Sequence, residues 1–277
     1  MNKYLVAVGQ INSRSDVQAN YATVERMIAE AAEKGAKLVI FPENMTCVGK
    51  PHKEIAEQVP GGESCTRMAA AAKKYGIWVH MGSIKETIPG DERVYNTSAL
   101  FSPEGEMMGL YRKLHPCDMS SAPGRVTCES ATVRPGDEIV VTETELGTFG
   151  MSICYDVRFP EFYRAMALRG AQILCIPACF GTTTGEAHWE LMCRARAVEN
   201  GCYVLAAGQC GTKDNGSLRN GNSMIIDPWG KILARAGQDA EELLIAEIDL
   251  DYAADVRARL GVLKNRRTDI YDQIIKK

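Results

Sequence analysis

One pattern constrains the fold of this chain more than any other feature: strand, helix, strand, helix, strand and then a hairpin, in that order, in each half of the sequence. Leu38–Phe41 is a continuous apolar run, which is typical of a strand covered on both faces. Val17–Lys34 carries apolar residues on one helical stripe, and Gly35 then ends the helix. This alternation predicts sheets covered by helices, and two such sheets packed face to face, with helices outside, would accommodate both halves.

The same pattern predicts the boundaries of the elements. The expected strands are Tyr4–Gln10, Leu38–Phe41, Ile77–Ser83, Val94–Phe101, Met107–Lys113, Phe149–Cys154, Ile173–Cys179, Tyr203–Gly208, Asn222–Asp227, Lys231–Ala236 and Leu243–Leu250. The expected helices are Val17–Lys34, Glu63–Lys74, Pro160–Arg169, Ala187–Glu199 and Tyr252–Leu260. Turn residues at Ser102–Gly105 and Pro228–Gly230 predict two hairpins.

The length of 277 residues suits one large α/β domain. A hydrophobic content of 45% supplies a sizeable core, and no linker-like or low-complexity stretch divides the chain. We therefore expect a single domain over residues 1–277, in which residues from about 261 to 277 form a tail in an oligomer contact.

Charge and hydropathy exclude several classes of function. The net charge is −3, so no nucleic-acid partner is expected. The longest apolar runs are strand-sized, such as Ile173–Ile176, and a bilayer span needs roughly 20 residues, so no membrane partner is expected. The N-terminus passes into a strand-like run without the features of a signal peptide, which predicts a cytoplasmic protein.

Motif content gives no sign of a cofactor or a metal. The sequence has no G-x-G-x-x-G or G-K-[ST] loop for a nucleotide and no H-E-x-x-H for zinc. Its 10 cysteines are scattered, with no C-x-x-C pair and no metal-ligand spacing. Most of them are expected to be reduced, small hydrophobic residues of the core.

Two charged residues lie at the ends of expected strands. Glu43 follows Phe41 and Pro42, and proline ends a central strand, so this carboxylate lies where open α/β sheets place ligands. A helix cap or a salt-bridged loop residue is the alternative for Glu43. Lys113 ends a hairpin strand, a position where a solvated lysine is the commoner case.

Cys154 lies between a buried strand and a helix that is expected to start near Phe159 or Pro160. Such a bend exposes a side chain, and a nearby helix N-terminus lowers the pKa of a thiol from about 8.5. The alternative is a core cysteine, as we expect for Cys175 and Cys202. The position between strand and helix distinguishes Cys154 from those two.

Together, Glu43, Lys113 and Cys154 supply the kinds of group that acyl transfer by a thiol requires. A thiol nucleophile needs a base, and acyl transfer needs a place for the oxyanion. None of the four histidines lies at a strand end beside the nucleophile, so a carboxylate is the alternative base. A free glutamate has a pKa of about 4.3, which a dry pocket would have to raise before Glu43 could act as the base. A nearby ammonium would favour the thiolate and hold the oxyanion.

The segments around these residues resemble the three signature segments of the nitrilase superfamily of carbon–nitrogen hydrolases. They are Phe41–Glu43, Tyr111–Lys113 and Cys154–Glu161, in the right order over nearly the whole chain. Gly185–Glu190, Arg194–Asn200 and Asp227–Gly230 look like the branch of the omega-amidases and deaminated-glutathione amidases. Ala206–Gly211 leans towards the second of these groups.

The resemblance implies a four-layer α-β-β-α sandwich in a homodimer or higher homo-oligomer. It implies Glu43 as general base, Lys113 as oxyanion stabiliser and Cys154 as nucleophile. It also implies a second glutamate that orients the site. Glu129 matches that position best, with an exposed loop glutamate as the alternative.

The implied reaction is the cleavage of a small carboxylate-bearing amide to an acid and ammonia through a thioester. Deaminated glutathione and an omega-amide of a 2-oxo acid are the candidate substrates. The backbone N–H of Tyr155 would hold the oxyanion together with Lys113. Arg158 is the candidate anchor for the substrate carboxylate, because a guanidinium suits a bidentate contact, and a surface salt bridge to Glu161 or Asp156 is its alternative.

Three further residues follow the strand that ends near Cys179 and are candidate pocket residues: Phe180, Thr184 and His188. Loop packing or dimer contacts are their alternatives. Competing functions are hydrolysis of an N-carbamoyl compound or a nitrile within the same superfamily, and a non-catalytic binding protein that keeps the fold. The intact set of Glu43, Lys113 and Cys154 argues against the last of these.

Overall fold

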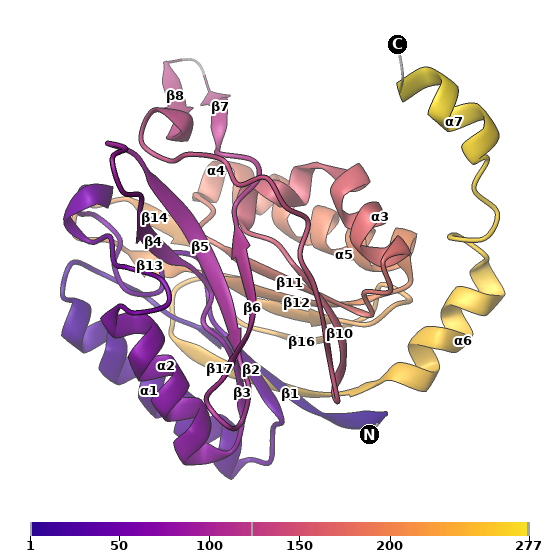
Figure 1. Ribbon diagram of the computed structural model, residues 1–277, viewed down its shortest axis with the longest axis horizontal. Helices are drawn as coiled ribbons and strands as arrows, with labels where there is room; N and C mark the ends of the chain where they lie inside the picture. Colours follow the sequence, from indigo (N-terminus) through magenta and orange to yellow (C-terminus); the bar gives the residue numbers. More distant parts are fainter. Residues whose placement is uncertain (1, 123, 276–277) are drawn as a thin grey trace.

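The computed structural model describes residues 2–122 and 124–275 of the chain. Two sheets lie face to face, and each is covered by helices on its outer side (Figure 1). The expected four-layer α-β-β-α sandwich is therefore confirmed.

The first sheet has seven strands and the second has six. In spatial order the first contains β17 (Glu242–Asp249), β1 (Lys3–Gln10), β2 (Leu38–Ile40), β3 (Trp78–His80), β5 (Val94–Phe101) and β4 (Ile84–Thr87), with β6 (Met107–Arg112) also paired to β5. The second contains β16 (Ile232–Arg235), β15 (Met224–Ile226), β12 (Tyr203–Gly208), β11 (Ile173–Ala178), β10 (Gly147–Met151) and β9 (Val141–Thr144). Each half of the sequence thus contributes three parallel strands, β1 to β3 and β10 to β12, and then antiparallel ones.

The alternation of side chains along the strands explains why both faces of the first sheet are apolar. On β1, Tyr4, Val6 and Val8 join the core between the two sheets, whereas Ala7 joins the core beneath the helices. Successive side chains of a strand point to opposite faces. A strand buried on both faces therefore has a continuous apolar run, as the sequence predicted for residues 38–41.

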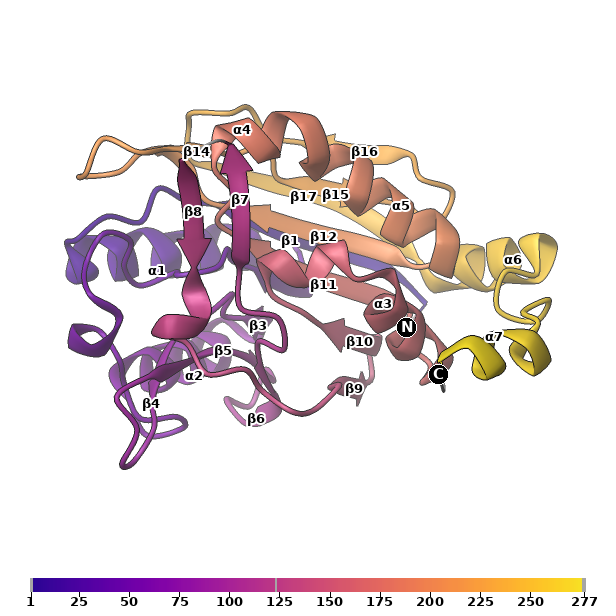
Figure 2. The same cartoon turned by 90° about the horizontal axis from the view of Figure 1, so that it is seen from above.

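Four main helices form the outer layers, and their bounds agree closely with the expected ones. α1 (Val17–Glu33) and α2 (Glu63–Tyr75) pack on the first sheet, while α3 (Pro160–Leu168) and α5 (Glu190–Asn200) pack on the second (Figure 2). The helix expected to start at Ala187 begins instead with a π-helical turn, η4 (Gly185–Trp189), which follows the short helix α4 (Thr182–Thr184).

Strand β17 connects the two halves. It belongs to the second half of the sequence but pairs antiparallel with β1 over its whole length, from Lys3 opposite Asp249 to Gln10 opposite Glu242. The sequence predicted the strand and could not assign its sheet, because pairing partners are a property of the tertiary structure.

The strand expected over Ile77–Ser83 is present but shorter, because β3 covers only Trp78–His80 and the chain turns before β4 starts at Ile84. Gly82 between them has φ +70°, and a Cβ there would lie 2.0 Å from the carbonyl oxygen of Pro42. This close approach lets the Ser83 N–H donate to the same oxygen at 3.2 Å. Gly82 thus allows β3 to turn beside the backbone that leads to Glu43.

Two hairpins and several short helices were not predicted. They are β7 (Asp118–Ala122) with β8 (Arg125–Cys128), β13 (Cys210–Thr212) with β14 (Leu218–Asn220), and the 3₁₀ helices η1 (His52–Glu54), η2 (Glu129–Ala131) and η3 (Cys154–Arg158). Both hairpins are rich in polar residues, so no apolar alternation marked them in the sequence.

After the sandwich, α6 (Leu250–Leu260) and α7 (Thr268–Ile275) run along one side of the molecule and extend away from the sheets (Figure 1, Figure 2). The tail expected from residue 261 onward includes α7, and its last residues, Lys276 and Lys277, lie outside the described part. Within the described residues, no helix combines the length and apolar character needed to cross a membrane.

The contact at Gly82 predicts a large cost for a methyl group. Gly82→Ala must adopt a left-handed conformation and also displace the Pro42 carbonyl, so we expect a loss of about 2–5 kcal/mol in the free energy of unfolding. Gly76→Ala is the matched control, because Gly76 has φ +60° with nothing within 4 Å of its Cβ. It should cost only about 1–2 kcal/mol. Equal losses in urea denaturation would contradict this role of Gly82.

Candidate active site

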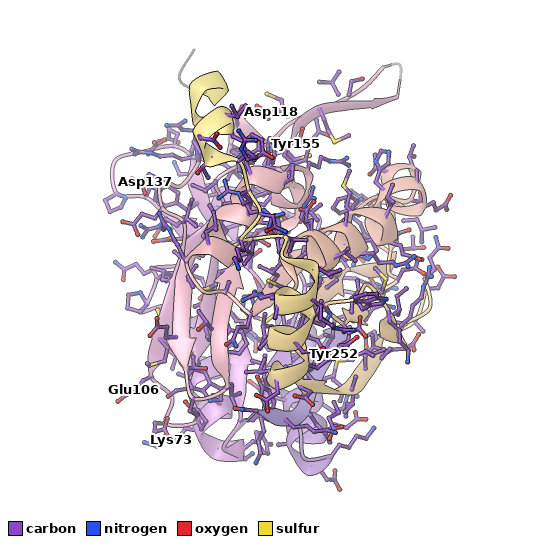
Figure 3. The ribbon with its side chains drawn as sticks, turned by 90° about the vertical axis from the view of Figure 1, so that its right-hand side faces the viewer. Lys73, Glu106, Asp118, Asp137, Tyr155 and Tyr252 are labelled. Carbon is purple, nitrogen blue, oxygen red and sulfur yellow. The ribbon has the colours of Figure 1, made fainter. Side chains whose placement is uncertain are left out.

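The candidate catalytic residues lie at the ends of strands from both sheets. Glu43 comes shortly after β2, Lys113 directly follows β6, and Cys154 comes shortly after β10. All three side chains, with Glu129, line one cavity of about 750 Å³. In Figure 3, Tyr155 and Asp118 lie at one end of the molecule, and Lys73 and Glu106 lie at the opposite end. The structure therefore brings together the residues that the sequence singled out.

Glu43 is buried, and one oxygen of its carboxylate is held by two hydrogen bonds. Its Oε1 accepts hydrogen bonds from Lys113 Nζ at 3.0 Å and from Asn96 Nδ2 at 2.9 Å. Its backbone carbonyl accepts from Gln209 Nε2 at 3.1 Å, which ties the loop after β2 to the segment after β12. These contacts hold the carboxylate against the ammonium group of Lys113.

Lys113 joins the two acidic residues of the site. Its side chain is 1% exposed, and Nζ donates to Glu43 at 3.0 Å and to Glu129 at 2.8 Å. Burial by itself lowers the pKa of this ammonium, but the charges of Glu43 and Glu129 outweigh burial and raise the pKa well above its usual value. Lys113 therefore stays protonated in the folded protein.

Glu129 begins η2 and accepts from Lys113 and from the backbone N–H of Cys117, the latter at 2.6 Å. Its other oxygen lies 3.9 Å from Nζ of Lys85, a lysine whose side chain is 2% exposed. Burial favours the neutral form of Glu129, but the charges of Lys113 and Lys85 win and lower its pKa to about 2. The side chain of Glu129 is 11% exposed, so Glu129 is a mostly buried, ion-paired carboxylate and not the exposed loop residue of the alternative.

Cys154 is the first residue of η3 and has φ +52°, a conformation that costs energy for a residue with a side chain. It is 8% exposed and lines the cavity. The expectation of a lowered thiol pKa is wrong. Burial and the charge of Glu43 raise the pKa of Cys154 well above its usual value, although Lys113 acts in the opposite direction. The resting thiol is therefore protonated and needs a base.

A buried aspartate fixes the turn that carries Cys154. Asp156 is 0% exposed and accepts from the Ile153 N–H at 2.8 Å, from the Tyr111 hydroxyl at 2.7 Å and from His115 Nδ1 at 2.7 Å. Tyr111 precedes Lys113 by two residues, so this network couples the turn of the thiol to the strand of the ammonium. Asp156 stood in the signature segment, but only the contacts reveal what it does.

The candidate binding residues are placed around this centre. Tyr155, Arg158, Phe180 and Thr184 line the cavity. His188 is not among the residues that line it; its Nδ1 lies 3.3 Å from Nη1 of Arg158, so it contacts the cavity only through that arginine. The ring of Phe180 packs against that of Trp189 at a tilt of 45°, with 5.2 Å between ring centroids.

Arg158 has no ion pair with a described carboxylate, so the salt bridge to Glu161 or Asp156 is not formed. Its guanidinium lies 5.5 Å from the ring centroid of Tyr155 and 5.4 Å from that of Phe180. Its buried Nε has no hydrogen-bond partner. A guanidinium that lines the cavity without an acidic partner can bind an anionic group of a ligand.

Sequence reasoning missed several polar residues of the cavity or its wall, among them His52, Lys85, Asn96 and Arg219. Lys85 carried a weak signal, since it is a charged residue that follows the apolar Ile84 in a strand next to Asn96. The others are ordinary polar residues in the sequence. Among the described residues, no group of three or more His, Cys, Asp or Glu side chains is arranged to hold a metal ion.

Comparisons with known proteins agree with this geometry. The carbon–nitrogen hydrolase family model matches residues 5–258. The chain is 39% identical to the omega-amidase NIT2 of Danio rerio over 98% of this chain and 97% of that protein. It is 37% identical to the human deaminated glutathione amidase over 98% of this chain and 84% of that protein.

Solved structures agree as well. The chain superposes on Nit3 of Saccharomyces cerevisiae, described as a member of the nitrilase superfamily, with a TM-score of 0.86 and 32% identity over 96% of this chain and 97% of that one. It superposes on the NitFhit protein of C. elegans with a TM-score of 0.87 and 33% identity over 98% of this chain and 66% of that one.

The lowered pKa of Glu129 predicts a pH-dependent stability. Because folding lowers this pKa from 4.5 to about 2, the contribution of the ionised carboxylate is complete above pH 4.5 and is lost as the pH falls towards 2. Its full size is on the order of 3 kcal/mol. We expect the Tm difference between wild type and Glu129→Gln, measured by circular dichroism, to shrink as pH falls from 6 to 3. Exposed Glu33→Gln should show no such trend, and a constant difference for Glu129→Gln would refute the assignment.

Proposed function

The chain belongs to the carbon–nitrogen hydrolase family, and from that premise we propose that it is an amidase that uses Cys154 as nucleophile, Glu43 as general base and Lys113 as oxyanion stabiliser. One observation carries the proposal: a buried ammonium is hydrogen-bonded to two carboxylates on the same cavity surface as a thiol in a strained turn. Strained residues and ionisable groups with perturbed pKa values both cluster at active sites.

The chemistry follows from the charges. Glu43 takes the proton of Cys154 as sulfur attacks the amide carbon and the carbonyl π electrons move to oxygen. The charge of Glu43 is one cause of the raised thiol pKa, so its protonation removes that repulsion while the attractive charge of Lys113 remains. Proton transfer thus favours the thiolate character that attack requires.

The tetrahedral oxyanion would be held by Lys113 Nζ and by the backbone N–H of Tyr155 in the first turn of η3. Glu43 then gives its proton to the departing nitrogen as the carbon–nitrogen bond breaks. Water, deprotonated by Glu43, next attacks the thioester and releases the acid and the thiol. Glu129 acts through Lys113, which it keeps protonated and in place.

Two observations support a substrate class: the names of the relatives, and the guanidinium of Arg158, which lacks an acidic partner. Two relatives are named for omega-amides and for deaminated glutathione. We propose that this chain likewise cleaves a small amide bearing a carboxylate, such as deaminated glutathione or an omega-amide of a 2-oxo acid, and that Arg158 binds that carboxylate. Phe180 and Thr184 would contact the rest of the substrate, and His188 would orient Arg158.

We propose further that the chain is a single domain that assembles as a homodimer or larger homo-oligomer. The two sheets share one core, which supports the single domain. Large apolar side chains are exposed on the outer helices and on the tail, namely Leu168, Leu191, Val198, Ile270 and Tyr271, which supports assembly through these elements. All 10 cysteines are free, which suits a reducing compartment such as the cytoplasm.

The first test is amide hydrolysis itself. We expect release of ammonia, or of an amine from a substituted amide, in a screen of 2-oxo acid omega-amides and deaminated glutathione, without carbon dioxide. Cys154→Ala should lower kcat by at least about 10³-fold while leaving the circular dichroism spectrum unchanged. Cys65→Ala, on the buried face of α2, is the matched control and should keep kcat. Normal turnover by Cys154→Ala would overturn the nucleophile assignment.

The second test concerns Arg158. Replacement by Gln removes charged hydrogen bonds to the substrate carboxylate, so KM for carboxylate-bearing amides should rise about 10- to 100-fold. Neutral amides of the same size should keep their KM. If both kinds of amide lose equally, Arg158 does not bind the carboxylate.

A further inference from the structure

Lys213 is a buried lysine that the proposed reaction does not use. It lies in the loop that joins β13 to β14 and is 2% exposed. Its Nζ donates to Gln209 Oε1 at 2.7 Å and to Asn12 Oδ1 at 2.8 Å. Among the described residues, no carboxylate forms an ion pair with it. A buried charge is normally paired with an opposite one, so an ammonium that binds two neutral amides requires an explanation.

The charge of Lys213 is kept at a cost. Burial lowers the pKa of Lys213 to about 8, and the guanidiniums of Arg219 and Arg14 act in the same direction, whereas Cys179 and Cys210 oppose them. The side chain is therefore still an ammonium at neutral pH, although its surroundings disfavour the charge. Departures of this kind from the usual rules of burial are expected at functional sites.

Gln209, which Lys213 contacts, connects the two sheets beside the active site. It directly follows β12, and its backbone N–H donates to the carbonyl of Ala178, the last residue of β11, at 2.9 Å. Its side-chain Nε2 donates to the carbonyl of Glu43 at 3.1 Å and to that of Asn44 at 3.3 Å. The amide of Gln209 therefore ties the loop of Glu43, which follows a strand of the first sheet, to the second sheet.

The amide of Gln209 can do this in only one orientation. Its nitrogen must face the two carbonyls, and its oxygen then faces Lys213 and the backbone N–H of Ser13, which donates to it at 3.0 Å. An ammonium has three donors and no acceptor, so Lys213 favours the oxygen side of the amide and disfavours the flipped one. A hydrogen bond from a charged donor is also stronger than one from a neutral donor.

The turn after Glu43 needs this support. Asn44 has φ +57°, a left-handed conformation that costs energy for a residue with a side chain. Its N–H donates to Ser83 Oγ at 3.1 Å, and the N–H of Met45 donates to the Ser83 carbonyl at 2.9 Å. A strained residue persists only where its neighbours hold it firmly. Without the bonds from Gln209, we expect this turn to relax and the backbone of Glu43 to move.

We propose that Lys213 is a positioning residue of the reaction: it orients the amide of Gln209, which holds the loop of Glu43 so that the carboxylate stays beside Cys154. This inference rests on the proposed function, in which Glu43 takes and returns a proton. Neither Lys213 nor Gln209 is among the residues that line the cavity, so both act through Glu43. A displaced base impairs proton transfer and leaves the binding of the amide intact.

Lys213→Met tests the proposal, because it removes the ammonium and keeps a long apolar side chain. Hydrogen exchange followed by mass spectrometry monitors the loop without any turnover. We expect the N–H groups of Asn44 and Met45 to exchange at least about tenfold faster than in the wild type. With an amide that the wild type cleaves, kcat should fall about 10- to 100-fold while KM stays the same.

Gln209→Glu is a second variant that guards against a loss of folding. It gives Lys213 a carboxylate as partner, and it removes the donor to the carbonyls of Glu43 and Asn44. It should therefore fold, and it should show the same faster exchange and the same loss of kcat. Normal exchange and normal kcat in Gln209→Glu would overturn the proposal.

Tyr203→Phe is the matched control. Tyr203 lies at the other end of β12, and its hydroxyl accepts from the N–H of Asp249 in β17 at 3.0 Å. This variant therefore also loses a hydrogen bond between the two sheets, and its Tm should fall. Exchange at Asn44 and Met45, and kcat, should not change.

The remaining outcomes separate this inference from the proposed function. Unchanged exchange in Lys213→Met, or faster exchange with normal kcat, would overturn the role of Lys213. Equal effects of Tyr203→Phe would overturn it too, because they would reflect lost stability alone. If the wild type cleaves no amide but Lys213→Met still loosens the loop, the amidase function fails, and the control of the Glu43 loop by Lys213 stands.

Discussion

The ammonium of Lys113, buried between two glutamates at the wall of the cavity, is the interaction on which the rest of the site depends. A charge removed from water is tolerable only when it is paired and hydrogen-bonded. The charges of Glu43 and Glu129 raise the pKa of Lys113 and keep it protonated. In turn, the charges of Lys113 and Lys85 lower the pKa of Glu129 and keep it ionised. The same pairs fix the position of the groups beside Cys154, so the electrostatics and the geometry of the site have one cause.

The architecture delivers these charges because two similar halves face one another. Parallel strands in each half end at the same edge of their sheets, and the loops that follow meet across the sandwich. Contacts across the halves then lock the loops together. The Tyr111 hydroxyl donates to Asp156, and Gln209 donates to the backbone of Glu43. A site of this kind therefore depends on the relative placement of the two sheets, because its residues come from both.

Burial has a direct effect on the reactive thiol. It makes the thiol of Cys154 hard to ionise, against the expectation from its position near a helix start, because a buried anion beside Glu43 is unfavourable. The guanidiniums of Arg158 and Arg219 line the same cavity without an ion pair to a described carboxylate. A protonated thiol beside the carboxylate of Glu43, with cationic side chains on the cavity wall, is consistent with the proposed cleavage of an anionic amide.

The sequence by itself determined the local features, because hydrophobic period and turn residues act over a few neighbours. It predicted most strands and helices within a few residues, the sandwich through its resemblance, and Glu43, Lys113, Cys154 and Glu129 as a set. Only the tertiary structure decided what depends on distant neighbours. β17 joins the sheet of the first half, Gly82 must lack a side chain because Pro42 lies against it, and Arg219 enters the cavity through its pairing with Gly181. Burial and charge pairing are sums over residues far apart in the chain, so the protonation of Cys154 and the partners of Lys113 exist only once the chain has folded.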